Sequence, residues 1–350
     1  MFFFRKKFRF VMEKNPKARN IMFLVLFCLG FTVGFLIEWR VSVSREENAV
    51  FDFRKIHPIN ENYKFISPLL GFDSSEKAYS EYVSLEKDVQ TFIDKPDISK
   101  KLDKISVYFR NLETGQWVGI NENDEFNPAS LLKVPVMILY FKLAESDPGI
   151  LKRTYFYTEK DLNLLKSVSG GDDSTAMIPD KPYTVEELIR EMIIRSDNVA
   201  KYLLILHSPE NDLKNIYGNL GVQISGRDQY RISTKTYSLF FRTLYNGTFL
   251  NYEMSEKALK LLSEAEFKNG LIAGVPSDVK VAHKYGRYAT VENGRAINVE
   301  AHDCGIVYYP DSPYLLCVMT RGYDTDQLED IIQKISKLTY DFLKENKIKQ

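Results

Sequence analysis

Hydrophobic residues recur at helical spacing near the C-terminal end of the chain, between residues 324 and 345. Apolar positions three or four residues apart predict one amphipathic helix there, built around Leu328, Ile331, Ile332, Ile335, Leu338, Phe342 and Leu343. Short apolar or alternating runs predict five strands, at 104–110, 116–120, 279–291, 304–309 and 314–320. The turn at 111–115 joins the first two strands as a hairpin.

A helical pattern fills the long interval between the second and third strands. Thr184 and Glu187 have the spacing of a capping box, which places the start of one helix at residue 184. Helices are predicted at 74–93, 130–144, 184–195, 199–206, 235–245 and 255–265. Because strands from both ends of this region must share one sheet, the order predicts an α/β fold with a mostly antiparallel five-stranded sheet flanked by helices.

The N-terminal segment has a different pattern. Residues 21–37 form an uncharged apolar run, which at about 1.5 Å per residue nearly spans a hydrocarbon core and predicts a transmembrane helix. The basic residues of 1–20 are expected to stay in the cytoplasm, so 38–73 reads as an extracytoplasmic stalk and 74–350 as an extracytoplasmic domain. A cleaved signal peptide is the alternative, although 37–40 lacks the small residues of a cleavage site.

The charge of the chain is unevenly spread. Lys plus Arg and Asp plus Glu each number 47, but residues 1–40 hold eight basic and two acidic residues. The remainder therefore carries a net charge of about −6, which argues against nucleic acid as a partner because such binding needs a concentrated basic face. The four His and three Cys show no metal-ligand spacing, so we expect no metal and no cofactor.

Two of the cysteines flank a predicted turn. Cys304 and Cys317 lie on either side of residues 310–313, which would bring them onto adjacent strands. An oxidising compartment would permit a disulfide. We expect two buried free thiols instead, because cross-strand geometry is often unsuitable for a bridge.

One sequence, Ser130-Leu131-Leu132-Lys133, carries candidate nucleophilic chemistry. Residues three apart on a helix share a face, so Lys133 can reach the Ser130 hydroxyl and remove its proton if its own pKa is lowered. The spacing alone is weak evidence, since Ser84 and Lys87 repeat it within a polar helix. At Ser130 it opens an almost wholly apolar helix, which favours a functional role.

Two further short sequences follow in order, Ser196-Asp197-Asn198 and Lys284-Tyr285-Gly286. Together with the first they resemble the S-x-x-K, S-D-N and K-T-G elements of penicillin-recognising serine hydrolases, the family of class A β-lactamases and penicillin-binding proteins. The resemblance covers about residues 104–345. It implies an all-helical lobe at about 130–275 packed against the sheet, with the active site in the cleft between them.

The resemblance also implies roles for these residues. Ser130 would be the nucleophile and Lys133 its base, while Ser196 would pass the proton to the departing nitrogen and Asn198 would bind the substrate's amide. Lys284 would supply positive charge for a substrate carboxylate and for proton transfer. Backbone would approach the ligand closely at Gly286, and the N–H groups of Ser130 and Arg287 would form the oxyanion hole.

The chain departs from the family pattern at three places. Tyr285 stands where Thr or Ser is usual, and strand alternation leaves open whether its ring turns away from the cleft or intrudes into it. The interval 220–230 contains no Glu to activate a deacylating water. For the arginine that often assists carboxylate binding, only Arg287 and Arg321 are candidates.

These departures leave several functions open. We expect a membrane-anchored serine hydrolase that cleaves a β-lactam amide through a Ser130 acyl-enzyme. The alternatives are a D,D-peptidase acting on peptidoglycan stem peptides, and a cell-wall sensor that keeps the fold without turnover. A Ser-His-Asp triad using His302 and Asp303 is a further, less favoured alternative.

Overall fold

The computed structural model describes residues 64–66, 82–163, 175, 177–209, 212–222, 230–292 and 295–347. The chain divides into two units, Met1–Pro58 and Ile59–Gln350, and all described residues belong to the second. The predicted basic segment 1–20, the anchor 21–37 and most of the stalk 38–73 therefore lie outside the described residues. Within the described ranges, no helix has both the length and the apolar character needed to cross a membrane.

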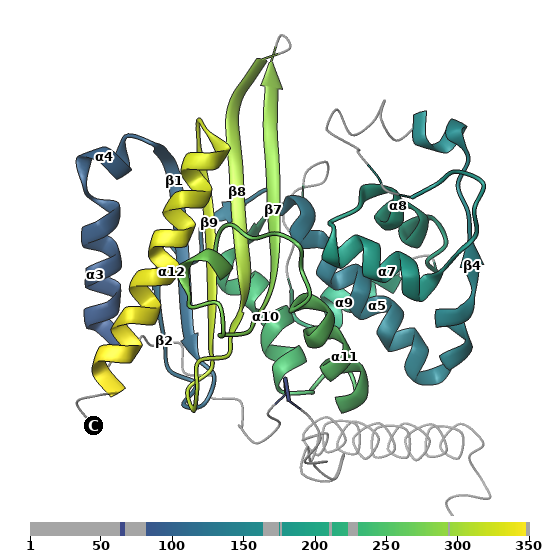
Figure 1. Cartoon of the computed structure of the whole chain (residues 1–350), viewed down its shortest axis with the longest axis horizontal. Helices are drawn as coiled ribbons and strands as arrows, with labels where there is room; N and C mark the ends of the chain where they lie inside the picture. Colours follow the sequence, from purple (N-terminus) through teal and green to yellow (C-terminus); the bar gives the residue numbers. More distant parts are fainter. Residues whose placement is uncertain are drawn as a thin grey trace, which may run out of the picture. The chain divides into compact units, whose positions relative to one another are not determined.

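A five-stranded antiparallel sheet forms the middle of the domain (Figure 1), in the order β2-β1-β9-β8-β7. Its strands are β1 (Leu102–Asn111), β2 (Trp117–Ile120), β7 (Val281–Glu292), β8 (Arg295–Val307) and β9 (Tyr314–Gly322). The predicted sheet and hairpin are confirmed. Strand β8 begins earlier than expected because its first half is rich in polar residues, which hide the alternation from a reading based on hydrophobicity.

Helices from the two ends of the domain cover one face of the sheet, namely α3 (Val83–Ile93), α4 (Pro96–Ser99) and α12 (Thr325–Lys347). The 3-10 turn η5 (Ile272–Gly274), which precedes β7, packs with them. The predicted amphipathic face of α12 is buried here, with Leu328, Ile331 and Ile335 fully inaccessible. Burying each such side chain contributes about 1.5–3 kcal/mol. This layer supports the sheet from the side opposite the helical lobe.

The helical lobe packs against the other face of the sheet and forms the larger of the two hydrophobic cores. Its main helices are α5 (Lys133–Ser146), α7 (Val185–Ile194), α8 (Asn198–Leu206), α9 (Asp212–Asn219), α10 (Thr234–Tyr245) and α11 (Tyr252–Leu262). Short elements connect them: the 3-10 turns η3 (Ala129–Leu132) and η4 (Pro148–Lys152), and the strand pairs β3 (Glu125–Phe126) with β6 (Ile232–Ser233) and β4 (Thr154–Tyr155) with β5 (Tyr183–Thr184). The capping box at Thr184 forms as predicted, with reciprocal bonds to Glu187.

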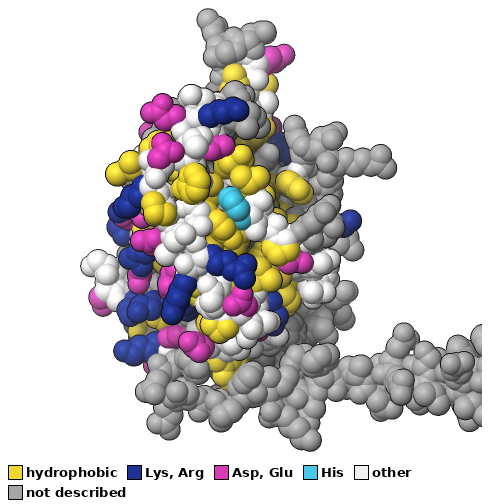
Figure 2. Space-filling model, turned by 90° about the vertical axis from the view of Figure 1, so that its right-hand side faces the viewer, with side chains coloured by type: hydrophobic (Ala, Val, Ile, Leu, Met, Phe, Trp, Pro, Cys, Tyr) yellow, Lys and Arg dark blue, Asp and Glu magenta, His cyan; other side chains and the backbone are white. Residues whose placement is uncertain are grey.

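The outer face of the helical lobe mixes apolar and charged side chains (Figure 2), with Lys and Arg interspersed among Asp and Glu. Several large hydrophobic side chains of this lobe are more than half exposed, namely Phe156, Ile178 and Leu206. On the described surface seen in this view, basic side chains do not form one continuous patch.

The structure joins Cys304 and Cys317 by a disulfide, so our expectation of two free thiols was wrong. The two residues are direct partners in the β8–β9 register. Sequence alone places both on neighbouring strands but does not fix the register that sets them opposite each other. The bridge lies within the sheet beside Lys284, which pairs with Cys304 across β7 and β8.

Candidate active site

Ser130 lies in the 3-10 turn η3, just before α5 begins at Lys133. We expected the α-helix to start at Ser130 itself. Pro135 has no N–H and cannot bond the carbonyl of Leu131 four residues back. That carbonyl instead accepts a hydrogen bond of 2.9 Å from the buried Tyr237 hydroxyl. Ala129 has a left-handed φ of 48°, an unusual conformation that surrounding contacts must hold in place.

A buried polar network from β8 fixes the chain three residues before Ser130. Glu300 accepts the N–H of Asn127 at 2.9 Å, and His302 Nε2 donates to the Asn127 carbonyl at 2.9 Å. Thr320 N–H donates to His302 Nδ1 at 3.3 Å, so the ring carries its proton on Nε2. Burial acts to raise the pKa of Glu300, but its contacts with His302 and Arg321 outweigh burial and lower that pKa.

This network corrects two earlier hypotheses. Arg321 pairs with Glu300 at 2.7 Å, so it supports the network and does not serve as a cleft arginine. Both ring nitrogens of His302 are hydrogen-bonded to backbone groups. Asp303 accepts a hydrogen bond from His283 at 2.9 Å. Neighbouring residues on a strand point to opposite faces, and the alternative triad of His302 and Asp303 is therefore wrong.

The Lys133 amine lies at the centre of the predicted site. Its side chain is fully buried, and Nζ lies 3.0 Å from Ser130 Oγ, 3.0 Å from Ser196 Oγ and 2.8 Å from Asn198 Oδ1. It also contacts the Ser196 carbonyl oxygen. The Ser196 carbonyl oxygen and Asn198 Oδ1 can only accept hydrogen bonds, so each of them faces an N–H bond of the Lys133 amine. The remaining side of the nitrogen faces the Ser130 and Ser196 hydroxyls. A neutral amine has its lone pair there and can accept a proton from Ser130.

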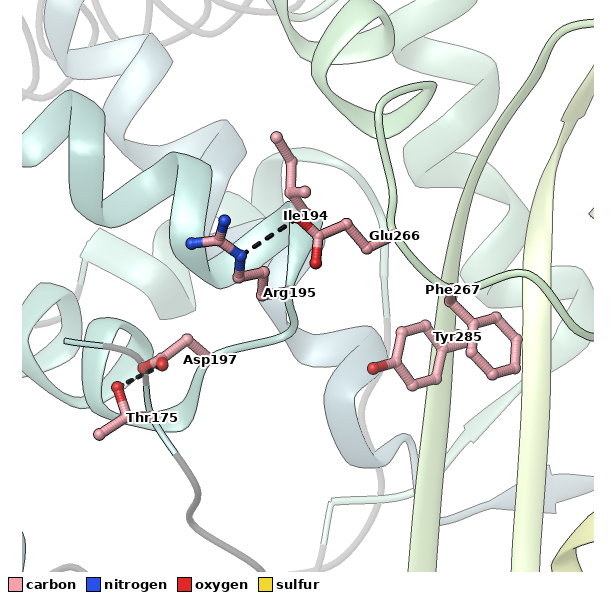
Figure 3. Close-up of a pocket in the computed structure, with 7 residues that line it drawn as sticks. All are labelled: Thr175, Ile194, Arg195, Asp197, Glu266, Phe267 and Tyr285. Atoms are coloured by element: carbon pink, nitrogen blue, oxygen red, sulfur yellow. Dashed lines mark hydrogen bonds and ion pairs between the residues drawn. The ribbon is translucent and has the colours of Figure 1, made fainter.

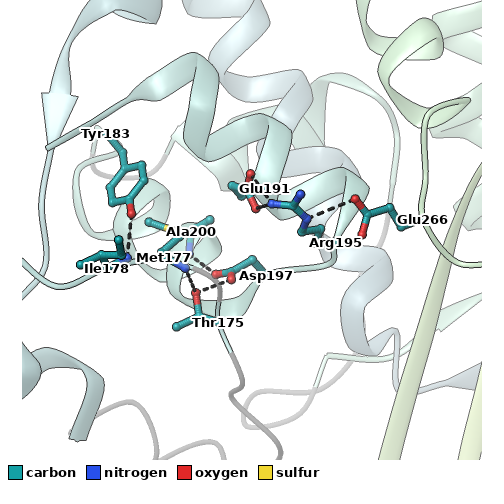
Figure 4. Close-up of polar contacts among 9 residues, drawn as sticks. All are labelled: Thr175, Met177, Ile178, Tyr183, Glu191, Arg195, Asp197, Ala200 and Glu266. Atoms are coloured by element: carbon teal, nitrogen blue, oxygen red, sulfur yellow. Dashed lines mark hydrogen bonds and ion pairs between the residues drawn. The ribbon is translucent and has the colours of Figure 1, made fainter. Parts of the chain in front are cut away.

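The Ser196-Asp197-Asn198 element forms a rigid bend between α7 and α8. Ser196 has a left-handed φ of 59°, and this aims its hydroxyl at the two lysines. Asp197 caps α8 by accepting the N–H of Ala200 at 2.8 Å and also accepts from Thr175 (Figure 4). Asp197 thus holds the bend.

Lys284 and Gly286 face the nucleophile from strand β7. Lys284 Nζ donates to Ser196 Oγ at 2.9 Å. Burial lowers the pKa of Lys284 to about 7, although Asp303 acts in the opposite direction. A Cβ added at Gly286 would lie 3.1 Å from the Pro128 carbonyl oxygen and 3.3 Å from the Ser130 nitrogen, so the strand can approach η3 this closely because residue 286 is glycine.

The ring of Tyr285 intrudes into the cleft instead of turning away. It stacks on Phe267 with ring centres 3.9 Å apart, and its hydroxyl end points toward the helical lobe (Figure 3). Burial raises the pKa of Tyr285, while a hydrogen bond from Ser196 partly opposes this. Strand alternation left this orientation open. Because β7 is an edge strand, side chains from both of its faces can reach the cleft.

A cavity of about 500 Å³ adjoins the lysine and serine cluster. Besides Thr175, which precedes β5, its lining residues come from the end of α7 and the α7–α8 bend, the segment after α11, and β7. The lining consists of Thr175, Ile194, Arg195, Asp197, Glu266, Phe267 and Tyr285. Sequence reasoning missed Arg195, Glu266 and Phe267. Arg195 directly precedes Ser196, and that adjacency was the one signal that could have pointed to it.

Arg287 extends away from the cluster toward α12. Its Nε contacts Glu329 at 2.5 Å, and this hydrogen bond is the main reason that the pKa of Arg287 is raised. The side chain is therefore engaged elsewhere. Its predicted role in the oxyanion hole involves only its backbone N–H, and that role stays a prediction. The interval expected to lack a deacylating Glu has residues 223–229 outside the described part.

Comparisons with known proteins place this geometry in context. A model of the beta-lactamase enzyme family, Beta-lactamase2, matches residues 84–343. The structure of PBP-A is similar with a TM-score of 0.63 at 20% identity, covering 75% of this chain and 96% of its own. A β-lactamase from Chitinophaga pinensis DSM 2588 gives 0.63 at 20% identity, covering 74% and 99%.

A mutant of PBP-A, described as an acyl-enzyme complex with penicillin G, is also similar. It has a TM-score of 0.62 at 19% identity and covers 75% of this chain and 97% of its own. No curated protein sequence matches this chain. At these identities the structural likenesses establish the fold, which is the α/β arrangement of a β-lactamase.

Proposed function

Because the chain belongs to the beta-lactamase enzyme family, we propose that it is a serine hydrolase that cleaves a β-lactam amide through an ester on Ser130. One observation carries the proposal. The side chains of Ser130, Lys133, Ser196 and Lys284 form a continuous line of contacts, each of 2.9–3.0 Å. This line connects a nucleophile, a base and a proton donor, with both lysines fully buried and both serines partly exposed.

The first half of the reaction follows from this line of contacts. Neutral Lys133 takes the proton of the Ser130 hydroxyl while Ser130 Oγ forms a bond to the carbonyl carbon. The carbon–nitrogen bond then breaks, and the departing nitrogen receives a proton from the Ser196 hydroxyl. Lys133 returns its proton to Ser196, so protons balance. The N–H groups of Ser130 and Arg287 stabilise the oxyanion.

A β-lactam is the substrate class that the resemblances favour. The matched family is a β-lactamase family, and the PBP-A mutant is described as acylated by penicillin G. A β-lactam also suits a site equipped for acylation, because breaking the carbon–nitrogen bond relieves the strain of the four-membered ring while the nitrogen stays attached to the acyl group.

The second candidate is a D,D-peptidase or penicillin-binding enzyme that acts on peptidoglycan stem peptides. A sensor that keeps the fold without hydrolysing its ligand is the related alternative. The interval 220–230 favours both, because this stretch contains no Glu and its single acid is Asp228. Without a deacylating base the Ser130 ester would persist. The proposed anchor at 21–37 suits either substrate, since it would hold the domain outside the cytoplasm at the membrane.

The test is a time course of intact mass after a penicillin is added to the full chain. We expect an adduct equal to the mass of the penicillin, located on Ser130 and absent in Ser130→Ala. Ser84→Ala is the matched control, because Ser84 has the same spacing to a lysine but lies exposed on α3.

The fate of the adduct separates the two candidates. An adduct that disappears while penicilloic acid accumulates supports a β-lactamase, and one that persists for hours supports a penicillin-binding enzyme or sensor. An equal adduct on the parent and on Ser130→Ala would overturn the assignment of the nucleophile, and no adduct on either would overturn the proposal.

A further inference from the structure

The Tyr285 ring covers the amine of Lys284. The Lys284 side chain has no exposed area, and its Nζ lies 4.0 Å from the centre of the Tyr285 ring. The same amine donates to Ser196 Oγ at 2.9 Å and to the Tyr285 carbonyl at 3.0 Å. The positive charge is therefore directed at groups of the protein, and an aromatic face occupies one side of it.

Contacts on both sides hold this ring in place. Phe267 stacks on it at 3.9 Å with an angle of 15° between the planes, and the Lys284 amine lies 4.0 Å from the ring centre. Phe267 in turn follows Glu266, whose N–H bonds the Ile194 carbonyl at 3.1 Å. The ring is thus a fixed wall between the helical lobe and the sheet (Figure 3).

The cavity beside the ring offers little to an anionic group. Lys284 is absent from its lining, whose charged members are Arg195, Asp197 and Glu266. Arg195 is already paired with Glu191 at 2.8 Å and with Glu266 at 3.2 Å (Figure 4). A carboxylate entering here would meet an excess of acidic groups and a cation that is already neutralised, so desolvating it would be poorly compensated.

We propose that Tyr285 is a specificity-determining residue that closes the Lys284 amine to substrate carboxylates, so that the site accepts acyl donors whose leaving group carries an uncharged ester or amide there. This inference rests on the proposed function and narrows it. The corresponding natural substrate class is an internal amide of a peptide, in contrast to a peptide with a free terminal carboxylate.

The experiment compares a penicillin with its methyl ester on the full chain and on Tyr285→Thr. These two compounds differ only in the charge of the carboxyl group next to the departing nitrogen. We expect the parent chain to form the Ser130 adduct faster with the ester than with the acid, because the paired Arg195 and the acidic lining disfavour the charged group. In Tyr285→Thr the acid-to-ester ratio of rates should rise about 10-fold, the factor that roughly 1.4 kcal/mol of new charge pairing provides.

Two variants separate the ring from other effects. Tyr285→Phe keeps the ring without its hydroxyl and should keep the parent acid-to-ester ratio. Phe267→Leu removes the stacking partner and should raise the ratio by a smaller factor, which preserves the test if Tyr285→Thr fails to fold. An unchanged ratio in both Tyr285→Thr and Phe267→Leu overturns the inference, and so does an equal rise in Tyr285→Phe.

A binding measurement keeps this inference independent of turnover. In the Ser130→Ala background, calorimetry should show penicillin binding about 10-fold more tightly when Tyr285 is also replaced by Thr. Equal affinities overturn the role of Tyr285 even if the parent chain is acylated. Tighter binding without any adduct on the parent would support the role of Tyr285 while the proposed hydrolase function fails.

Discussion

The wall of the cleft that carries Ser130 and the wall that carries Tyr285 are fixed in different ways. Before Ser130, both backbone groups of Asn127 bond to buried side chains of β8, and the Leu131 carbonyl accepts from Tyr237. Tyr285 lies on the edge strand β7 and is held chiefly by side-chain stacking on Phe267.

This difference explains where the family pattern is kept. The nucleophile turn tolerates little change because its backbone is determined from several directions at once. The edge strand has one free side, so a large side chain can be accommodated there without disturbing the sheet. The reacting groups therefore follow the family pattern, while the residue that meets the substrate's periphery departs from it.

The largest effect should come from Lys133→Ala on the nucleophile wall. Loss of the base should slow formation of the Ser130 adduct by about 10²- to 10⁴-fold, measured as the rate of mass increase with penicillin. Lys142→Ala is the control, since Lys142 lies on the same helix but pairs with Glu145 near the surface. A rate within a factor of two of the parent would remove Lys133 from the mechanism.

A smaller loss is expected where the two walls touch. In Gly286→Ala the new Cβ would press on the Pro128 carbonyl and the Ser130 nitrogen, displacing an oxyanion donor and lowering the acylation rate by about 10²- to 10³-fold. Gly218→Ala is the matched control, because a Cβ there meets no atom within 4 Å. If both variants acylate equally fast, the close approach of β7 to η3 is unimportant for the chemistry.

The smallest effect is a pH dependence of the free energy of unfolding that arises from Lys284 on strand β7. Burial lowers the pKa of Lys284 from 10.5 to about 7, so between these values the unfolded chain holds a proton that the folded chain has released. The free energy of unfolding should therefore rise with pH from about 7 to 10. Below pH 7 the cost of burying the charged amine is fully present.

Urea unfolding of the parent and of Lys284→Met at several pH values measures this effect. The difference in stability between the two chains should shift in favour of the parent as the pH increases, whereas Lys334→Met, on the exposed face of α12, should show no such trend. A difference independent of pH would mean that Lys284 keeps its ordinary pKa in the folded protein.

Strong local signals made much of the fold predictable. The amphipathic period of α12 and the capping box at Thr184 are encoded within a few turns of helix, and both form as expected. The beginning of β8 was missed because Glu300 and His302 are polar residues buried through specific partners. The hydrophobic pattern of the sequence cannot identify such buried polar residues. Their burial depends on hydrogen bonds to Asn127, which is far away in the chain.

The site likewise combines features that are encoded locally with features that depend on distant parts of the chain. Ser130, Lys133, Ser196 and Lys284 were found through their order along the chain, and the structure brings their side chains together. The orientation of Tyr285 and the pairing of Cys304 with Cys317 depend on which strand is at the edge and on register. Neither property is contained in the local sequence around those residues.

The order of strands in the sheet has a consequence for biosynthesis. Strand β1 lies between β2 and β9, and the register partner of Leu102 is Gly322 near the opposite end of the chain. A growing polypeptide therefore exposes the unpaired edge of β1 until almost all of the protein has been made, and such delayed long-range pairing slows folding. An exposed edge of this kind is prone to pair with other chains, so aggregation is most favoured in the interval before the C-terminal strands emerge.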